Sequence, residues 1–247
     1  MPDRRSARGP HPKDLACFAA DGVPALRQAV ADLSWLLTRG YSSKAALKLV
    51  GDRYALRDRQ RRALQRCAAG DEECARRARG RLEPEELAGR DVVVDGYNVL
   101  LTLEAALSGG VLLLARDGAL RDLAAMSAHY RRVHTTRPAI DLLADFFERH
   151  RPASVRWLLD RPVSNSGRLR GLIEEQVEGR LPQWTVELAD HTDRRLTEAS
   201  AVVATADSAV LDRCKAWINL ARHVVEERVP MAWIVDLGGN PSASGAL

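Results

Sequence analysis

"VVVDGYNVL", residues Val92 to Leu100, is the stretch that decides the fold of this chain of 247 residues. Three β-branched residues run directly into an Asp-Gly pair, and Asn98 follows shortly afterwards. A continuous apolar run of this kind is typical of a parallel strand that is buried on both faces. The carboxyl end of such a strand faces the crevice in which open α/β sheets bind their ligands. The sequence therefore predicts that Asp95 lies in a binding site.

Runs with strand character alternate with amphipathic stretches over residues 89–240. Further strands are predicted over GGVLLLARDG, SVRWLLD, WTVELADH, ASAVVATAD and MAWIVDLGG. Helices are predicted between them, among them one from about Ala119 to Arg132, one from Thr135 to His150, and one or two over SAVLDRCKAWINLARHVVEE. This alternation favours an α/β domain with a central parallel sheet that is covered by helices on both faces.

A small helical domain is predicted before the α/β domain, over residues 21–88. Apolar residues at helical spacing stop at Gly40, a typical C-cap residue, and Ser42 or Ser43 provides the next N-cap. Another helical stretch ends at Gly70. Residues 1–20 begin with a charged, Pro- and Gly-containing segment, so we expect a disordered tail there, and residues 241–247 are expected to form a second tail.

Aspartates close five of the predicted strands: Asp95, Asp117, Asp160, Asp207 and Asp236. Each one alone is explained as a helix cap or a turn residue. On one parallel sheet, however, all of them would converge on one crevice, where they would repel one another and raise each other's pKa. Hard divalent cations relieve such repulsion, so the pattern predicts a Mg²⁺ or Mn²⁺ site. The chemistry that such a site favours is hydrolysis of phosphodiester bonds.

Two short motifs resemble the PIN-like nuclease superfamily, particularly its NYN-type branch. In that superfamily an Asp closes the first strand, as Asp95 does here, and a Thr/Ser-x-Asp motif closes a later one, as Thr205 to Asp207 do. Asn98 matches the Asn that follows the first Asp in the NYN-type branch. Longer runs, including LTRGYSSKAALKLVGDRY, DGYNVLLTLEAALSGG and DRPVSNSG, are similar to the prokaryotic family called domain of unknown function 434. This similarity covers roughly residues 25–240.

The resemblance implies a three-layer PIN-like domain that binds Mg²⁺ or Mn²⁺ and cleaves RNA. By position, Asp95 and Asp207 are the strongest ligand candidates, Asp117 and Asp160 come next, and Asp236 is a further one.

Two features of this pattern stay open. Asn98 is either the cap of its helix or a group that orients water or a phosphate oxygen beside Asp95. The second acid of the superfamily aligns equally with Glu104, Asp117 and Asp122.

Basic residues are concentrated in the helical segment. Residues 42–81 contain twelve Lys and Arg against five acids, although the net charge of the whole chain is only +4. Such asymmetry points to a nucleic acid partner, contacted here by Arg57, Arg61 and Arg62. The alternative is a solvated helix face, because arginine is abundant throughout this chain.

A second anion site is predicted where DRPVSNSG meets the following helix. The free N–H groups of that helix would bind a phosphate, and the expected contact residues are Arg161, Ser164, Asn165, Ser166, Gly167 and Arg168. Simple N-capping by Ser164 or Ser166 is the alternative.

Other functional classes lack their signatures. There is no apolar run of membrane-spanning length, no secretory signal and no disulfide framework among the four cysteines, so we expect a cytoplasmic protein. A haloacid-dehalogenase-type phosphatase would need an Asp where Tyr97 stands, and the chain has no Walker A or G-x-S-x-G motif. Two alternatives to a nuclease remain: a non-catalytic nucleic-acid-binding protein and a hydrolase of small phosphorylated molecules.

Overall fold

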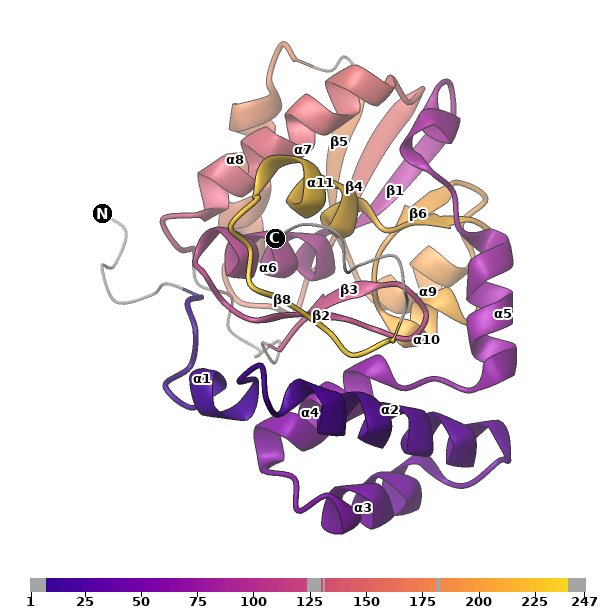
Figure 1. Cartoon of the computed structure of the whole chain (residues 1–247). Coiled ribbons are helices and arrows are strands. Elements are labelled where there is room, and N and C mark those ends of the chain that lie inside the picture. Colours follow the sequence, from indigo (N-terminus) through magenta and orange to yellow (C-terminus); the bar gives the residue numbers. More distant parts are fainter. Residues whose placement is uncertain (1–7, 124–129, 131, 181–182, 240–247) are drawn as a thin grey trace.

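The computed structural model describes residues 8–123, 130, 132–180 and 183–239 of the chain (Figure 1). Its centre is a five-stranded parallel sheet with the strand order β5-β4-β1-β6-β7. The strands are β1 (Asp91–Asp95), β4 (Ser154–Asp160), β5 (Trp184–Ala189), β6 (Val202–Ala204) and β7 (Trp217–Ile218). The predicted central parallel sheet is therefore confirmed.

Strand β1 is the middle strand and is buried on both faces. Val92 and Val94 point into a core formed with the helices of one face, α6 (Gly96–Leu107), α7 (Thr136–His150), α8 (Ser166–Val177) and α11 (Leu220–Arg228). Val93 points into the opposite core, which is closed by α9 (Thr192–Thr197) and α10 (Ser208–Leu211). This alternation follows from the two-residue period of a strand and produces three layers.

A second, three-stranded sheet has the order β3-β2-β8. Strands β2 (Leu112–Leu114) and β8 (Ile234–Asp236) are parallel, whereas β3 (Leu120–Asp122) pairs antiparallel with β2. The prediction of a helix beginning at about Ala119 was wrong at its start, because the Asp117-Gly118 pair turns the chain into a hairpin. The later part of that predicted helix, residues 124–129 and 131, lies outside the described residues.

The helices of the N-terminal segment are α1 (Asp14–Cys17), α2 (Val23–Thr38), α3 (Ser43–Arg53), α4 (Asp58–Cys67) and α5 (Asp71–Gly80), followed by the 3-10 turn η1 (Pro84–Leu87). Ser42 caps α3 through its side chain, and Gly40 follows α2 with a positive φ of 78°, as the sequence predicts. Residues 8–20 of the expected tail are folded, and they bury Cys17 and Phe18. Residues 1–7 and 240–247 are not described.

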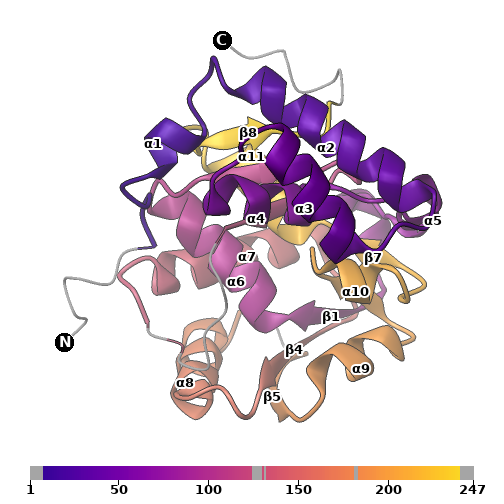
Figure 2. The ribbon, with the colours of Figure 1, turned by 90° about the horizontal axis from the view of Figure 1, so that it is seen from below.

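The helical segment shares its core with the second sheet. Leu33 of α2 and Leu64 of α4 belong to one apolar cluster with Leu113 of β2 and Val235 of β8. Viewed from below, α2, α3 and α4 lie across the rest of the molecule (Figure 2). The apolar core therefore crosses the expected boundary near residue 88. None of the described helices has the length and apolar character needed to span a membrane.

Candidate functional site

The candidate site lies where the strand order reverses. From β1 the chain continues to β4 and β5 on one side and then crosses to β6 on the other side of β1. In an open parallel sheet, ligands bind beyond the carboxyl ends of the strands at this switch point. Asp95 ends β1, and Thr205, Ala206 and Asp207 directly follow β6. These are the residues that the two short sequence motifs singled out.

Asp95 and the segment after β6 are held together by a short hydrogen-bond chain. The Thr205 hydroxyl donates to Asp95 Oδ2 at 2.7 Å and accepts from the Asp207 backbone N–H at 3.1 Å. The Asn98 carbonyl oxygen Oδ1 accepts from the Ala206 backbone N–H at 2.8 Å. Asn98 therefore fixes the loop after β6. It makes no side-chain cap bond to α6, whose N-cap residue is Asp95.

Gly96 allows this arrangement, because α6 begins directly against β4. A Cβ atom at position 96 would lie 2.5 Å from Leu159 Cδ2 and 2.8 Å from the Leu158 carbonyl oxygen. Only a residue without a side chain fits there without displacing β4. The Asp-Gly pair in the sequence thus reflects close packing between a helix and a strand.

Asp207 caps the helix that follows it and still has one free oxygen. Its Oδ1 accepts from the backbone N–H groups of Ala209 at 2.8 Å and Val210 at 3.2 Å. Its Oδ2 has no hydrogen-bond partner among the residues that the structure describes. The cap interpretation of this aspartate therefore holds, and it leaves an oxygen for a ligand.

Four aspartates influence one another at this edge of the sheet. Burial first, and then the charges of Asp207, Asp160 and Asp193, raise the pKa of Asp95 to about 7, against the opposing effect of the Thr205 hydrogen bond. Partial desolvation, together with Asp207 and Asp160, also raises the pKa of Asp193. Asp95 is 8% exposed, and only one of its oxygens accepts a hydrogen bond from the described residues.

Sequence reasoning missed Asp193. This residue lies in the first turn of α9, shortly after β5, rather than at the end of a strand. The available signal was its position after the strand-like run WTVELADH, but an Asp in the first turn of a helix is also an ordinary stabilising feature.

Asp117 lies in a different environment. Its carboxylate accepts from Arg77 Nη1 at 2.6 Å, from Arg121 Nη1 and Nη2 at 2.9 and 2.6 Å, and from the Ala119 backbone N–H at 3.1 Å. Burial alone would raise the pKa of Asp117, but the two guanidinium groups outweigh burial and lower it to about 2. The oxygens of Asp117 are thus occupied by arginine, and we leave this residue out of the proposed metal ligands.

The remaining acidic candidates are also held elsewhere. Asp236 ends β8 of the second sheet, accepts the backbone N–H groups of Gly238 and Gly239, and pairs with Arg27. Consequently, the expectation of five strand-end aspartates on one sheet is corrected to three, namely Asp95, Asp160 and Asp207.

The two other competitors for the second acid are buried in α6 and β3. Glu104 bonds Arg8, Tyr130 and Thr136. Asp122 accepts from the Thr102 hydroxyl at 3.1 Å. The interactions of Asp95 therefore point to Asp160 and Asp193, rather than to these residues, as its acidic neighbours.

The turn before α8 is strained and does not cap that helix with a side chain. Asn165 adopts a left-handed conformation with φ 69° and donates to the Tyr130 carbonyl, while the Ser166 hydroxyl donates to the Arg161 carbonyl. Ser164 Oγ is buried and has no hydrogen-bond partner among the described residues. Arg161 pairs with Asp190, whereas Arg168 and Gly167 lie in the first turn of α8. Phosphate binding at this turn stays a prediction.

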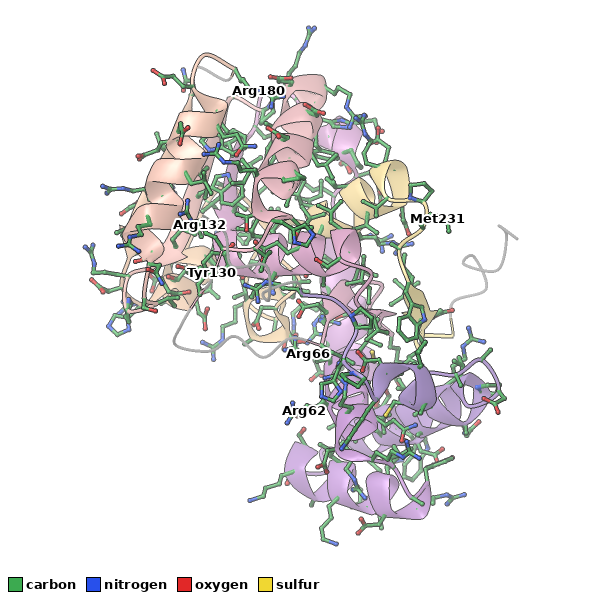
Figure 3. The ribbon with its side chains drawn as sticks, turned by 90° about the vertical axis from the view of Figure 1, so that its left-hand side faces the viewer. Arg62, Arg66, Tyr130, Arg132, Arg180 and Met231 are labelled. Carbon is green, nitrogen blue, oxygen red and sulfur yellow. The ribbon has the colours of Figure 1, made fainter. Side chains whose placement is uncertain are left out.

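The basic residues of α4 divide into two groups. Arg61 pairs with Asp52 and bonds the Leu56 carbonyl, so it belongs to the contact between α3 and α4. Arg57 is exposed at the start of α4. Arg62 and Arg66 project from one side of α4, at the junction with the α/β domain (Figure 3).

A pocket of about 470 Å³ lies at this junction. Its lining includes Arg62, Gln65 and Arg66 from α4 and Asn98, Asp207 and Ser208 from the edge of the sheet. The helical segment and the acidic edge of the sheet thus form two walls of the same pocket.

The carboxylates fit a divalent cation only with help from other ligands. In the described part of the chain, no three His, Cys, Asp or Glu side chains are grouped so that they could hold a metal ion. Mg²⁺, however, is usually bound by one or two carboxylates, with waters and substrate phosphates as its other ligands. Asp95 and Asp207 suit that kind of site, because each has one oxygen that accepts no hydrogen bond from the described residues, and Thr205 joins the two.

Comparison with known proteins places most of this site in one family. Residues 84–223 match the model of the domain of unknown function DUF5616. The chain belongs to this family. Residues 25–79 match a second model, the protein of unknown function DUF434, so the predicted similarity to that family is confirmed for the helical segment. The junction pocket therefore lies between a DUF434 segment and a DUF5616 domain.

An uncharacterised protein of Methanocaldococcus jannaschii, MJ0935, is 28% identical over 203 residues, which cover 81% of this chain and 97% of that protein. No solved structure matches the chain.

Proposed function

We propose that this DUF5616 protein is a metal-dependent nuclease that cleaves phosphodiester bonds, with RNA as its favoured substrate. The observation that carries the proposal is Asp95. This carboxylate is buried at the switch point of a parallel sheet, has one free oxygen, and has a pKa raised to about 7 by burial and by three neighbouring aspartates. A buried carboxylate in such surroundings needs a proton or a cation.

Mg²⁺ or Mn²⁺ is the cation that we propose, with Asp95 and Asp207 as its protein ligands. When bound, it would activate water and neutralise charge on the phosphate. The Thr205 hydroxyl links the Asp95 carboxylate to the backbone N–H of Asp207, and Asn98 holds the backbone of Ala206 between them. Asp160 and Asp193 add negative charge that favours cation binding.

The resemblance to PIN-like and NYN-type nucleases supports this assignment. The supporting features are the order of the motifs and their positions after β1 and β6. The family matches carry no activity of their own, since both families are described as having unknown function.

A non-catalytic nucleic-acid-binding protein is the second candidate. The observation that favours it is the lack of a three-ligand metal cluster among the described side chains. In that case the basic residues of α4 would provide affinity, and binding would be sensitive to salt but indifferent to Mg²⁺.

The test is cleavage of a labelled single-stranded RNA in Mn²⁺ or Mg²⁺. We expect the wild type to cleave, and Asp95→Asn and Asp207→Asn to lose cleavage, because an amide is a weaker cation ligand than a carboxylate. Asp236→Asn is the matched control, since Asp236 ends a strand of the other sheet, and its activity should stay near that of the wild type. RNA binding by the wild type without cleavage in either metal would overturn the nuclease and favour the binding protein.

A further inference from the structure

The junction pocket combines positive charge with access to Asp207, one of the two proposed metal ligands. Arg62 and Arg66 line it from α4, and Asp207 and Asn98 line it from the edge of the sheet. Its volume of about 470 Å³ is within the usual range of small-ligand pockets. A group held by the arginines would therefore lie in the same pocket as a group held at Asp207.

Arg62 differs from several arginines around it, because those are paired with acidic residues. Arg59 pairs with Asp14, Arg61 with Asp52, and Arg77 with Asp117. The exposed side chain of Arg62 forms no ion pair with any residue in the ranges that the structure covers. An unpaired guanidinium that borders a pocket is suited to an anionic ligand.

The α4 wall is fixed in place relative to the acidic loop. The buried guanidinium of Arg121 donates to the Arg66 carbonyl at 3.0 Å, to the Ala206 carbonyl at 2.7 Å and to Asp117. One side chain thus ties α4 directly to the segment between Thr205 and Asp207. The spacing between the arginines and the carboxylates is therefore a built property of the fold rather than a chance approach of surface residues.

We propose that Arg62, with Arg66, binds a backbone phosphate one step along the strand from the phosphate at Asp95 and Asp207. This inference rests on the proposed function and adds the position at which a second phosphate of the substrate binds. Two anion-binding positions in one fixed frame suit two linked phosphates of a polynucleotide better than the single phosphate of a mononucleotide. The negative charge of Asp207 repels a phosphate when no metal is bound, so the arginines supply most of the attraction in that state.

The test is binding of a fluorescein-labelled single-stranded RNA of about 12 nucleotides, followed by anisotropy in EDTA so that cleavage does not interfere. We expect Arg62→Ala to weaken binding by about tenfold, as for loss of one charge-assisted hydrogen bond. It should also make the slope of log K against log salt shallower by about 0.7. Arg62→Lys should recover part of the affinity. A DNA strand of the same sequence should show the same loss, because the contact is to phosphate.

Arg90→Ala is the control. Arg90 is an exposed arginine that directly precedes β1, at the opposite end of that strand from Asp95, and it does not line the pocket, so its loss should change affinity by less than about twofold. Equal losses for both alanine variants would overturn the inference in favour of diffuse attraction. A loss confined to RNA, or displacement of the strand by an equal concentration of uridine monophosphate, would also overturn it.

The two proposals fail separately. An Arg62-specific loss of binding in a protein that never cleaves RNA would leave the phosphate site standing and refute the nuclease. Metal-dependent cleavage with no Arg62-specific effect on binding would support the nuclease and refute the phosphate site at Arg62.

Discussion

Replacing Asp117 by Asn is expected to destabilise the protein strongly. The Asp117 side chain is 1% exposed and lies between Arg77 and Arg121, which are themselves buried. The amide removes the charge that both guanidinium groups face. Within the described residues, the only other acid that forms an ion pair with either of them is Asp212, which pairs with Arg77. Breaking a buried ion pair in this way costs about 3–5 kcal/mol of unfolding free energy.

The pKa of Asp117 gives a second measure of the same interaction. A fall from 3.8 to about 2 corresponds to roughly 2–3 kcal/mol. Because the folded pKa is the lower one, this contribution is fully present above about pH 4 and is lost as the pH falls through about 2. The two values agree at about 3 kcal/mol, which is the loss of unfolding free energy that we expect for Asp117→Asn at pH 7.

The assay is urea unfolding at pH 7, monitored by circular dichroism, with Asp71→Asn as the matched control. Asp71 also pairs with an arginine, Arg116, but it is 63% exposed, so the control should lose about 1 kcal/mol or less. A loss for Asp117→Asn that does not exceed that of the control would refute the reasoning. In addition, the variant should lose less stability than the wild type between pH 4 and pH 2.

Three further predictions concern stability. Asp95→Asn should stabilise the metal-free protein at pH 8 by up to about 4 kcal/mol, because the folded pKa of about 7 lies above the ordinary 3.8 and stability therefore falls as the pH rises between these values. A thermal unfolding midpoint of the variant no higher than that of the wild type would contradict this. Addition of Mn²⁺ should raise the midpoint of the wild type only. Leu64→Ala should cost about 2–5 kcal/mol, whereas Leu49→Ala, at an exposed leucine, should cost about 0.5 kcal/mol or less; equal urea midpoints would show that the shared core is misplaced. Gly96→Ala should cost about 1–3 kcal/mol, since the added methyl group meets Leu159 and the Leu158 carbonyl; an unchanged midpoint would mean that β4 can move aside.

The sequence predicted four of the five central strands, because each lies in a local apolar run. It missed β7, whose two residues lie within SAVLDRCKAWINLARHVVEE, where helices were predicted. The run from Val92 to Val94 needs burial on both faces, and the structure places it between two cores. The positions of Asp95 and Asp207 follow from the same pattern, since each directly follows a strand of that sheet.

The pairing within the second sheet could not be predicted in this way. The runs that contain β2 and β8 were predicted as strands, but β3, with three residues, is too short for a periodic signal and was predicted as the start of a helix. The pairing of β2 with β8 joins residues that are far apart in the sequence, so nothing local separates Asp117 and Asp236 from the aspartates of the main sheet. Asp193 was not predicted as a site residue, because it lies in the first turn of a helix and only the fold brings it close to Asp95.

The core shared by α2, α4 and β8 has a consequence for the order in which the chain folds. Strand β8 comes after all the other described elements in the sequence, yet Val235 of this strand and Leu237 directly after it belong to the core of the first helices. During synthesis the helical segment leaves the ribosome first, and its apolar face has no complete partner until β8 has emerged. Contacts between such distant segments also slow the search for the native state. The newly made helical segment therefore keeps part of its apolar surface exposed until β8 is in place.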